Sequence, residues 1–159
     1  MDSIKKGSIK ITYYQKTHKV YIDEMLQEIS LEFNESIFSE STNLKTLLPG
    51  AYWVALNDNK VIGTIGIIKI KNKTGILKKM MLKKSFRGKD YGVSKLLLQT
   101  AINWCIENSI NQIYLGTMKQ FKAAQVFYEK NGFRRISENE LPNGFLNNPL
   151  DEIFFQREL

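Results

Sequence analysis

The sequence predicts an α+β (mixed α/β) fold around a single central sheet, and three features of its pattern carry this prediction. Residues 51–84 hold three runs of β-forming residues separated by turn residues, which is typical of an antiparallel meander. A strand–helix–strand unit follows the meander, and two closing strands near the C-terminus form a hairpin-like pair. Because antiparallel strands come first, the pattern disfavours a doubly wound parallel sheet.

The N-terminal third alternates between strand and helix. Residues 8–14 are rich in Ile, Thr and Tyr, which predicts a strand. Apolar residues then recur at helical spacing among Asp and Glu over residues 18–33, which predicts a helix. Residues 39–50 are polar and are broken by Pro49–Gly50, so we expect a connection with room for a short helix.

The strands of the middle third are separated by two turns. Asn57, Asp58 and Asn59 tolerate left-handed backbone and predict a hairpin turn, and a second turn lies over residues 72–75. The helix that follows is the clearest in the sequence, because its apolar residues recur along one stripe. These residues are Val93, Leu96, Leu97, Ala101, Trp104 and Cys105.

The last third completes the sheet. Residues 111–117 predict a short strand, and the next helix stops at Asn131–Gly132, where glycine suits a left-handed cap. We expect a strand to start at Phe133 and, after a loop over 138–149, a final strand over 151–159. The sequence shows no internal repeat and no low-complexity linker, so we interpret residues 1–159 as a single domain.

Composition narrows the class of protein. The 159 residues suit one domain, and Cys105 is the only cysteine, which excludes an internal disulfide and a cysteine-based metal cluster. No stretch approaches the roughly 18 unbroken apolar residues of a membrane span, and the first ten residues lack an apolar signal core. We therefore expect a soluble, cytoplasmic protein.

The formal net charge of +7 points to an anionic partner. The densest basic cluster, residues 69–89, ends in the loop before the clear helix. We interpret the surplus as solubility charge plus one local anion site. Nucleic acid is the less favoured partner, because no RNP-type aromatic pattern, zinc finger or recognition helix accompanies the charge.

The loop before the clear helix reads Arg87-Gly88-Lys89-Asp90-Tyr91-Gly92. A helix N-terminus exposes unpaired N–H groups that attract anions, and glycines let a phosphate approach the backbone. The loop lacks the Gly-Lys-Ser/Thr of a P-loop and the third glycine of a Rossmann motif. Taken alone, it is more simply interpreted as a polar turn in front of a helix.

A second motif, one βα unit later, changes this interpretation. Residues 124–133 read AQVFYEKNGF. Together with the loop 87–92, they resemble the GNAT superfamily of N-acetyltransferases, whose acyl-CoA loop usually reads Arg/Gln-x-x-Gly-x-Gly/Ala. The resemblance covers the chain from Ile9 to Leu159. It implies a mostly antiparallel twisted sheet of about seven strands, splayed between the fourth and fifth strands and flanked by helices.

The resemblance implies acetyl-CoA as the co-substrate, and no metal. In the family, backbone amides of the loop and of the helix start hold the pyrophosphate, while the preceding strand pairs with the pantetheine arm. The corresponding residues here are Met80, Met81 and Leu82 on the strand, followed by Arg87, Gly88, Lys89, Asp90, Tyr91, Gly92 and Val93.

The resemblance also places Tyr128 where a hydroxyl commonly lies near the CoA sulfur. The implied reaction moves the acetyl group of acetyl-CoA to a primary amine by direct attack in a ternary complex. A phenol can protonate the departing thiolate, so Tyr128 is the expected catalytic acid. The alternative is a core tyrosine whose ring packs and whose hydroxyl finds a partner.

No general base follows from the sequence. Residues 76–80, on the strand before the loop, carry no carboxylate where members of the family often have a glutamate. Other acidic residues suit the surface or the lining of an amine site, and the single histidine suits a helix cap. They are Glu24, Glu28, Glu32, Glu140, Asp151, Glu152 and His18.

Two residues depart from the family pattern. Asp90 replaces a glycine, although its amide can still serve a phosphate and aspartate tolerates a positive φ. Phe121 stands where members often place an asparagine, which weakens one expected cofactor contact. These departures keep a second interpretation open, a catalytically weak or inactive module that binds acyl-CoA or a protein on the same fold. The amine acceptor stays unassigned, and the loop residues Pro142, Phe145 and Leu146 suit either a cover over the site or a homodimer contact.

Overall fold

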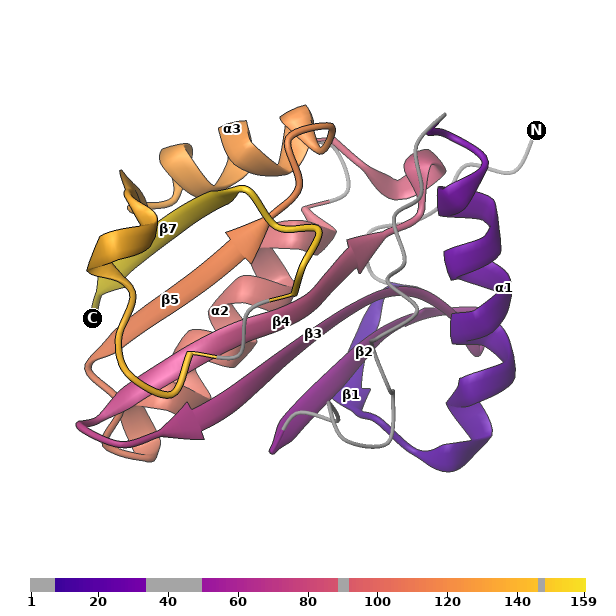
Figure 1. Cartoon of the computed structure of the whole chain (residues 1–159). Coiled ribbons are helices and arrows are strands. Elements are labelled where there is room, and N and C mark those ends of the chain that lie inside the picture. Colours follow the sequence, from indigo (N-terminus) through magenta and orange to yellow (C-terminus); the bar gives the residue numbers. More distant parts are fainter. Residues whose placement is uncertain (1–7, 34–49, 89–91, 146–147) are drawn as a thin grey trace.

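A seven-stranded sheet runs through the protein in the order β1-β2-β3-β4-β5-β7-β6 (Figure 1). The computed structural model describes residues 8–33, 50–88, 92–145 and 148–159. The strands are β1 (Lys10–Tyr13), β2 (Ala51–Asn57), β3 (Lys60–Ile70), β4 (Thr74–Leu82), β5 (Gln112–Thr117), β6 (Arg134–Ile136) and β7 (Ile153–Glu158). The helices are α1 (Lys19–Ser30), α2 (Val93–Glu107) and α3 (Lys122–Lys130), with short 3-10 helices η2 (Lys16–His18), η3 (Lys84–Phe86) and η4 (Glu138–Glu140).

The first four strands form the predicted antiparallel arrangement. β1 pairs with β2, β2 with β3 and β3 with β4, each antiparallel. The β2–β3 turn holds Asp58 at φ 50° and Asn59 at φ 63°, so both central residues adopt the left-handed backbone that the right-handed twist of a hairpin favours. The short helix expected over residues 39–50 falls almost wholly outside the described residues.

β4 and β5 are the parallel pair of the sheet, and they stay together over a short distance only. The register joins Thr74 to Gln112, Gly75 to Ile113 and Ile76 to Tyr114. Beyond these pairs the strands diverge toward their C-terminal ends (Figure 1). This confirms the predicted splay between the fourth and fifth strands. The splay opens the sheet at the C-terminal end of β4, from which the chain continues toward α2.

The two closing strands form the predicted hairpin-like pair, and β7 of this pair also joins β5. β7 lies between β5 and β6 and is antiparallel to both. The sheet therefore gains its last edge from β6, a strand of three residues. A short edge strand exposes few unpaired backbone groups, which limits edge-to-edge association.

α1 and α2 pack on opposite faces of the sheet. Successive strand residues point to opposite faces. On β2, Trp53 and Ala55 belong to the core cluster that includes α2, whereas Val54 belongs to the cluster that includes α1. The predicted α2 stripe is wrong at Leu96, whose side chain is 47% exposed, because the buried face also takes in Leu98 and Ile102.

No helix in the described ranges combines the length and the apolar character that a membrane span requires.

Candidate active site

A cleft of about 1670 Å³ opens where β4 and β5 separate. Its walls come from β4, the end of β5, the N-terminus of α2, one side of α1, α3 and the loop before β7. Most of the predicted site residues that the structure describes line it: Met80, Met81, Leu82, Arg87, Gly88, Gly92 and Tyr128. Predicted residues Lys89, Asp90 and Tyr91 lie outside the described residues.

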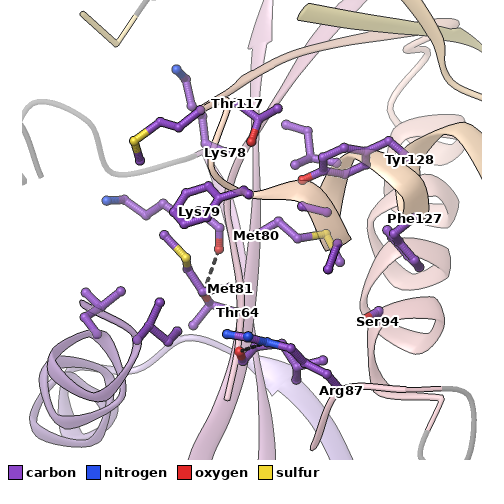
Figure 2. Close-up of a pocket in the computed structure, with 18 of the residues that line it drawn as sticks. Thr64, Lys78, Lys79, Met80, Met81, Arg87, Ser94, Thr117, Phe127 and Tyr128 are labelled. Atoms are coloured by element: carbon purple, nitrogen blue, oxygen red, sulfur yellow. Dashed lines mark hydrogen bonds between the residues drawn. The ribbon is translucent and has the colours of Figure 1, made fainter. Parts of the chain in front are cut away.

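A β-bulge bends β4 at the middle of the cleft. Thr64 pairs with Met81 and Gly66 with Lys78, so two residues of β4 stand opposite Ile65 alone. Lys79 takes a left-handed φ of 56°, a conformation that costs a non-glycine residue about 1–3 kcal/mol. The Thr64 hydroxyl donates a hydrogen bond of 2.6 Å to the Lys79 carbonyl, and Figure 2 shows this bond at the cleft wall. Thr64 therefore holds the strained turn of β4 in place.

The bulge brings two consecutive lysines to the same cleft. In a regular strand Lys78 and Lys79 would point to opposite faces, yet both line this cleft (Figure 2). Burial lowers the pKa of Lys78, and the charge of Asp151 partly offsets that effect. Burial also lowers the pKa of Lys79, with a further contribution from the charge of Lys78. Lys78 Nζ lies 5.4 Å from the centre of the Phe145 ring, a cation–π distance.

The divergence of β4 from β5 leaves part of one backbone edge of β4 without a partner strand. Met81 and Leu82 pair with β3 through one edge of the strand. On the other edge, the pairing with β5 ends at Ile76 within the described residues. Backbone groups of β4 beyond that point therefore face the cleft, where an extended amide chain can pair with them.

The loop before α2 presents two glycines in positive φ. Gly88 has φ 113° and Gly92 has φ 63°, and a Cβ at either position would meet no described atom within 4 Å. Gly92 is the N-cap of α2 and supplies no side-chain cap. The first intrahelical bond runs from the Leu96 amide to the Gly92 carbonyl, which leaves the amides of Val93, Ser94 and Lys95 without an intrahelical partner. The predicted residue Val93 is fully buried and does not line the cleft, whereas its neighbours Gly92, Ser94 and Lys95 do.

Arg87 uses its donors within the chain. Its guanidinium donates to both carboxylate oxygens of Glu32, at 2.5 and 2.9 Å, and its Nε donates to the Leu82 carbonyl at 3.0 Å. Its amide donates to the Lys84 carbonyl at 3.2 Å. Arg87 thus fixes the start of the loop against β4 and the residues that follow α1, and among the described residues the amides open to an anion are those at the start of α2.

Tyr128 packs in the core and also reaches the cleft with its hydroxyl. Its ring packs against Phe133 and Phe155, with centroids 5.5 and 5.7 Å away, and the residue is 4% exposed. Its hydroxyl points toward the cleft beside Thr117 (Figure 2). Burial, and secondly the negative charge of Asp151, raise the pKa of Tyr128 above its ordinary value. The phenol therefore stays protonated and can donate a proton only to a strongly basic neighbour.

Among the carboxylates that line the cleft, Asp151 has the environment that best suits a functional role. The Glu152 amide donates to the Thr117 carbonyl at 3.1 Å, which holds the start of β7 at the end of β5. Gly116 makes room for Asp151, because a Cβ on Gly116 would lie 2.8 Å from Oδ2. Burial raises the pKa of Asp151 to about 6, and the charge of Lys78 acts in the opposite direction.

The remaining candidate acids and the histidine have other partners or face solvent. Glu32 binds Arg87, Glu28 lies 3.6 Å from Lys83, and Glu24 is exposed. The exposed Glu140 accepts from the Ser137 amide, which lowers its pKa. His18 Nδ1 accepts from the Gln15 amide at 2.9 Å, as expected for a cap. In the described part of the chain, no group of three His, Cys, Asp or Glu side chains is placed to hold a metal ion.

Phe121 occupies the position where the family pattern often has asparagine. It is the N-cap of α3, and its ring meets Phe33 edge-on at 4.9 Å between centroids. Both rings line the cleft, so this wall is aromatic where the family pattern has an amide.

Sequence reasoning missed three features of this site. The left-handed backbone at Lys79 had no signal, because neither glycine nor asparagine stands there. The convergence of Lys78 and Lys79 depends on the bulge. Asp151 was only one of several acids, and its burial follows from the position of β7 beside β5 and from the space at Gly116.

Comparisons with known proteins agree with this geometry. The acetyltransferase (GNAT) domain family matches residues 49–135. The N-acetylaspartate synthetase of Danio rerio is 34% identical over 109 residues, which cover 66% of this chain and 38% of that protein. The human N-acetylaspartate synthetase is 30% identical over 112 residues, 68% of this chain and 36% of that protein. The chain thus matches less than half the length of either relative.

Solved structures share the fold over nearly the whole chain. A GNAT-family acetyltransferase from Staphylococcus aureus superposes with a TM-score of 0.82 and 35% identity, covering 94% of this chain and 98% of that one. The PaiA N-acetyltransferase of Thermoplasma acidophilum, solved in complex with coenzyme A, superposes with a TM-score of 0.72 at 20% identity, covering 96% and 99%. This second likeness concerns the fold alone. With the family match over residues 49–135 and the split sheet, the chain belongs to the GNAT acetyltransferase family.

Proposed function

We propose that the protein is an N-acetyltransferase that moves the acetyl group of acetyl-CoA to a primary amine by direct attack in a ternary complex. The observation that carries the proposal is the position of the Tyr128 hydroxyl at the split between β4 and β5, in a cleft that ends at the uncapped N-terminus of α2. A thioester placed in that split has a proton donor beside its sulfur.

The cleft suits the parts of acetyl-CoA in sequence. We assign the pyrophosphate to Gly88, Gly92 and the first amides of α2, because these donors and the helix dipole favour an anion. The pantetheine arm is placed along Met80–Leu82, where the free edge of β4 offers backbone donors and acceptors. The acetyl group then reaches the bulge at Lys79.

The chemistry requires one proton donor for the leaving group. The amine nitrogen attacks the thioester carbon, the C–N bond forms, and the C–S bond breaks with its electron pair on sulfur. Tyr128 donates its proton to that sulfur and regains one from the nitrogen, which loses a proton on becoming an amide. The raised pKa of Tyr128 keeps the phenol protonated, so that its hydroxyl is available as a donor to the sulfur when the C–S bond breaks.

The direct test is the release of CoA thiol from acetyl-CoA in the presence of a panel of amines, with the acetylated amine identified by mass. The proposal expects amine-dependent thiol release in a 1:1 ratio with acetylated product. A protein that binds acetyl-CoA but transfers nothing to any amine would be a binding module and would contradict the proposal.

A further inference from the structure

We propose that the amine acceptor also carries a carboxylate, with Asp151 receiving the ammonium end and its proton, and Lys79 binding the acidic end. The inference rests on the proposed function, because it assigns the two ends of the acceptor in the same cleft. It is carried by the opposite charges that β4 and the residues just before β7 bring to the cleft, which opens where β4 and β5 separate.

The first observation is the setting of the Asp151 carboxylate. Its Oδ2 occupies space that any side chain at residue 116 would fill. The carboxylate lines the cleft, and its charge acts on both Tyr128 and Lys78. Among the described residues, no donor forms a hydrogen bond to it. Its oxygens stay accessible from the cleft, so a ligand can reach them, and an ammonium is the ligand whose charge and donors match a carboxylate.

The second observation is the pair of lysines on β4. Both line the cleft because the bulge at Lys79 breaks the strand alternation. Within the described residues, no carboxylate lies within 4.0 Å of Lys79 Nζ. A partly buried ammonium beside a second one carries an energetic cost that an anion relieves. The charge of Lys78 acts on the pKa of both Lys79 and Asp151.

The lysines are at the wrong end of the cleft to serve the phosphates of CoA. Figure 2 shows Arg87 and Ser94 toward the end where the α2 N-terminus lies. Lys78, Thr117 and Tyr128 lie toward the other end. At that end the cofactor presents an uncharged acetyl thioester, so the proposal assigns the Lys79 charge to the acceptor.

The arrangement accounts for every proton of the acceptor. An ammonium enters with three protons, and Asp151 takes the first, which makes the nitrogen nucleophilic. After attack, the second passes to the sulfur by way of Tyr128, and the third stays on the product amide. Asp151 then releases its proton to solvent. No metal, oxidant or further reactant is needed.

Matched acceptor pairs test the inference. Thiol release is measured with L-aspartate against L-asparagine, L-glutamate against L-glutamine, and β-alanine against β-alaninamide, with spermidine as an amine without a carboxylate. We expect kcat/KM to be higher for at least one acid than for its amide by about tenfold or more, the usual worth of a charge-assisted contact. In Lys79→Met this preference falls to about twofold or less, because the variant keeps the length of the side chain and loses only the charge. Lys60→Met, on an exposed residue at the start of β3, is the matched control and leaves the preference unchanged.

Asp151→Asn separates the two ends of the acceptor. It is expected to lower kcat/KM for acids and amides alike, by about tenfold or more, because it removes the group that receives the proton. Glu152→Gln, on the exposed neighbour, leaves both unchanged. If spermidine and the amides are acetylated as fast as the acids, the inference is wrong while the proposed function stands. If no acceptor is acetylated, the proposed function fails and the inference fails with it.

Discussion

Arg87 and Glu32 form a two-bonded ion pair across 55 residues of sequence, with Nη1–Oε1 and Nη2–Oε2 at 2.5 and 2.9 Å. The pair joins Arg87, the first residue of the loop before α2, to the residues that follow α1. The third bond, from Arg87 Nε to the Leu82 carbonyl, extends the link to the end of β4. A residue that the motif suggests as a phosphate ligand thus acts first as a brace between α1, β4 and the loop.

We predict that Glu32→Gln and Arg87→Met are strongly non-additive. Each single change leaves a partly buried charge or donor without its partner, so a coupling free energy of about 1–3 kcal/mol is expected in a double-mutant cycle of unfolding. Urea unfolding of the four proteins measures it. The exposed pair Lys19–Asp23 is the control, with an expected coupling below about 0.5 kcal/mol. Additive effects at Arg87 and Glu32 would show that the pair does not brace the loop.

Gly92→Ala is predicted to weaken acetyl-CoA binding more than it weakens the fold. Its φ of 63° makes alanine cost about 1–2 kcal/mol, and the added methyl group would enter the open space at the N-cap of α2, where the account puts the anion. We expect KM for acetyl-CoA to rise by about tenfold or more. Gly132→Ala, at φ 86° after α3, carries a similar backbone cost away from those amides and should leave KM within about twofold. Equal KM values for acetyl-CoA in the two variants would contradict the assignment of the pyrophosphate to the N-terminus of α2.

Tyr128→Phe is predicted to lower kcat by about 10²–10⁴-fold, the usual range for a general acid, with KM nearly unchanged. The phenyl ring keeps its packing against Phe133 and Phe155, so the melting temperature should change little. Tyr13→Phe, on an exposed residue of β1, is the control. A variant with full turnover would show that the Tyr128 hydroxyl has no role in catalysis.

Asp151 predicts opposite effects of pH on activity and on stability. Its pKa in the folded protein is about 6, above the ordinary 3.8, so kcat/KM should fall as the pH drops below about 6 and the carboxylate takes up its proton. The folded state holds that proton more tightly than the unfolded state, so stability falls as the pH rises from 3.8 to about 6 and stays lower above it.

Asp151→Asn should therefore be less active and more stable at neutral pH. We expect the free energy of unfolding to rise by about 1–3 kcal/mol at pH 8, and the difference from the wild type to vanish near pH 4. The inflexion of kcat/KM near pH 6 should disappear. Lower stability of the variant at pH 8 would mean that Asp151 serves the fold and not the site. Urea unfolding at the two pH values measures the stability difference.

Thr64→Val is predicted to loosen the bulge. The change keeps the shape of a side chain that is 1% exposed but removes the donor to the Lys79 carbonyl. It also removes the hydrogen bond between the side chains of Thr64 and Tyr52, and these losses should lower the free energy of unfolding by about 1–3 kcal/mol and reduce kcat/KM for acetyl-CoA. Thr74→Val, whose hydroxyl donates to Asn72 outside the cleft, should affect stability only. An unchanged kcat/KM in Thr64→Val would show that the hydrogen bond at the bulge does not affect catalysis.

Local patterns were enough to predict most of the fold. The left-handed turn at Asp58 and Asn59 and the helix that starts at Val93 appear where residue type and periodicity place them. These elements depend on neighbouring residues, and the splay between the fourth and fifth strands followed from the family resemblance. The position of β7 between β5 and β6 depends on pairing between distant segments, and a hairpin-like pair at the C-terminus does not specify it.

The site was harder to predict from the sequence, because the partners and the burial of its charged residues depend on tertiary contacts. Tyr128 lies where the motif placed it, at the cleft. The partner of Arg87 lies 55 residues away and carries no signal that pairs it with the loop. Lys79 reaches the cleft through a backbone conformation that lysine rarely adopts, and Asp151 owes its raised pKa to burial.

The most direct test of the account is isothermal titration of the protein with acetyl-CoA. The cleft predicts one site per chain with saturable binding, weakened about tenfold or more by Gly92→Ala and little changed by Gly132→Ala. No heat of binding at millimolar acetyl-CoA, or the same affinity in both variants, would contradict the placement of the cofactor at the split between β4 and β5.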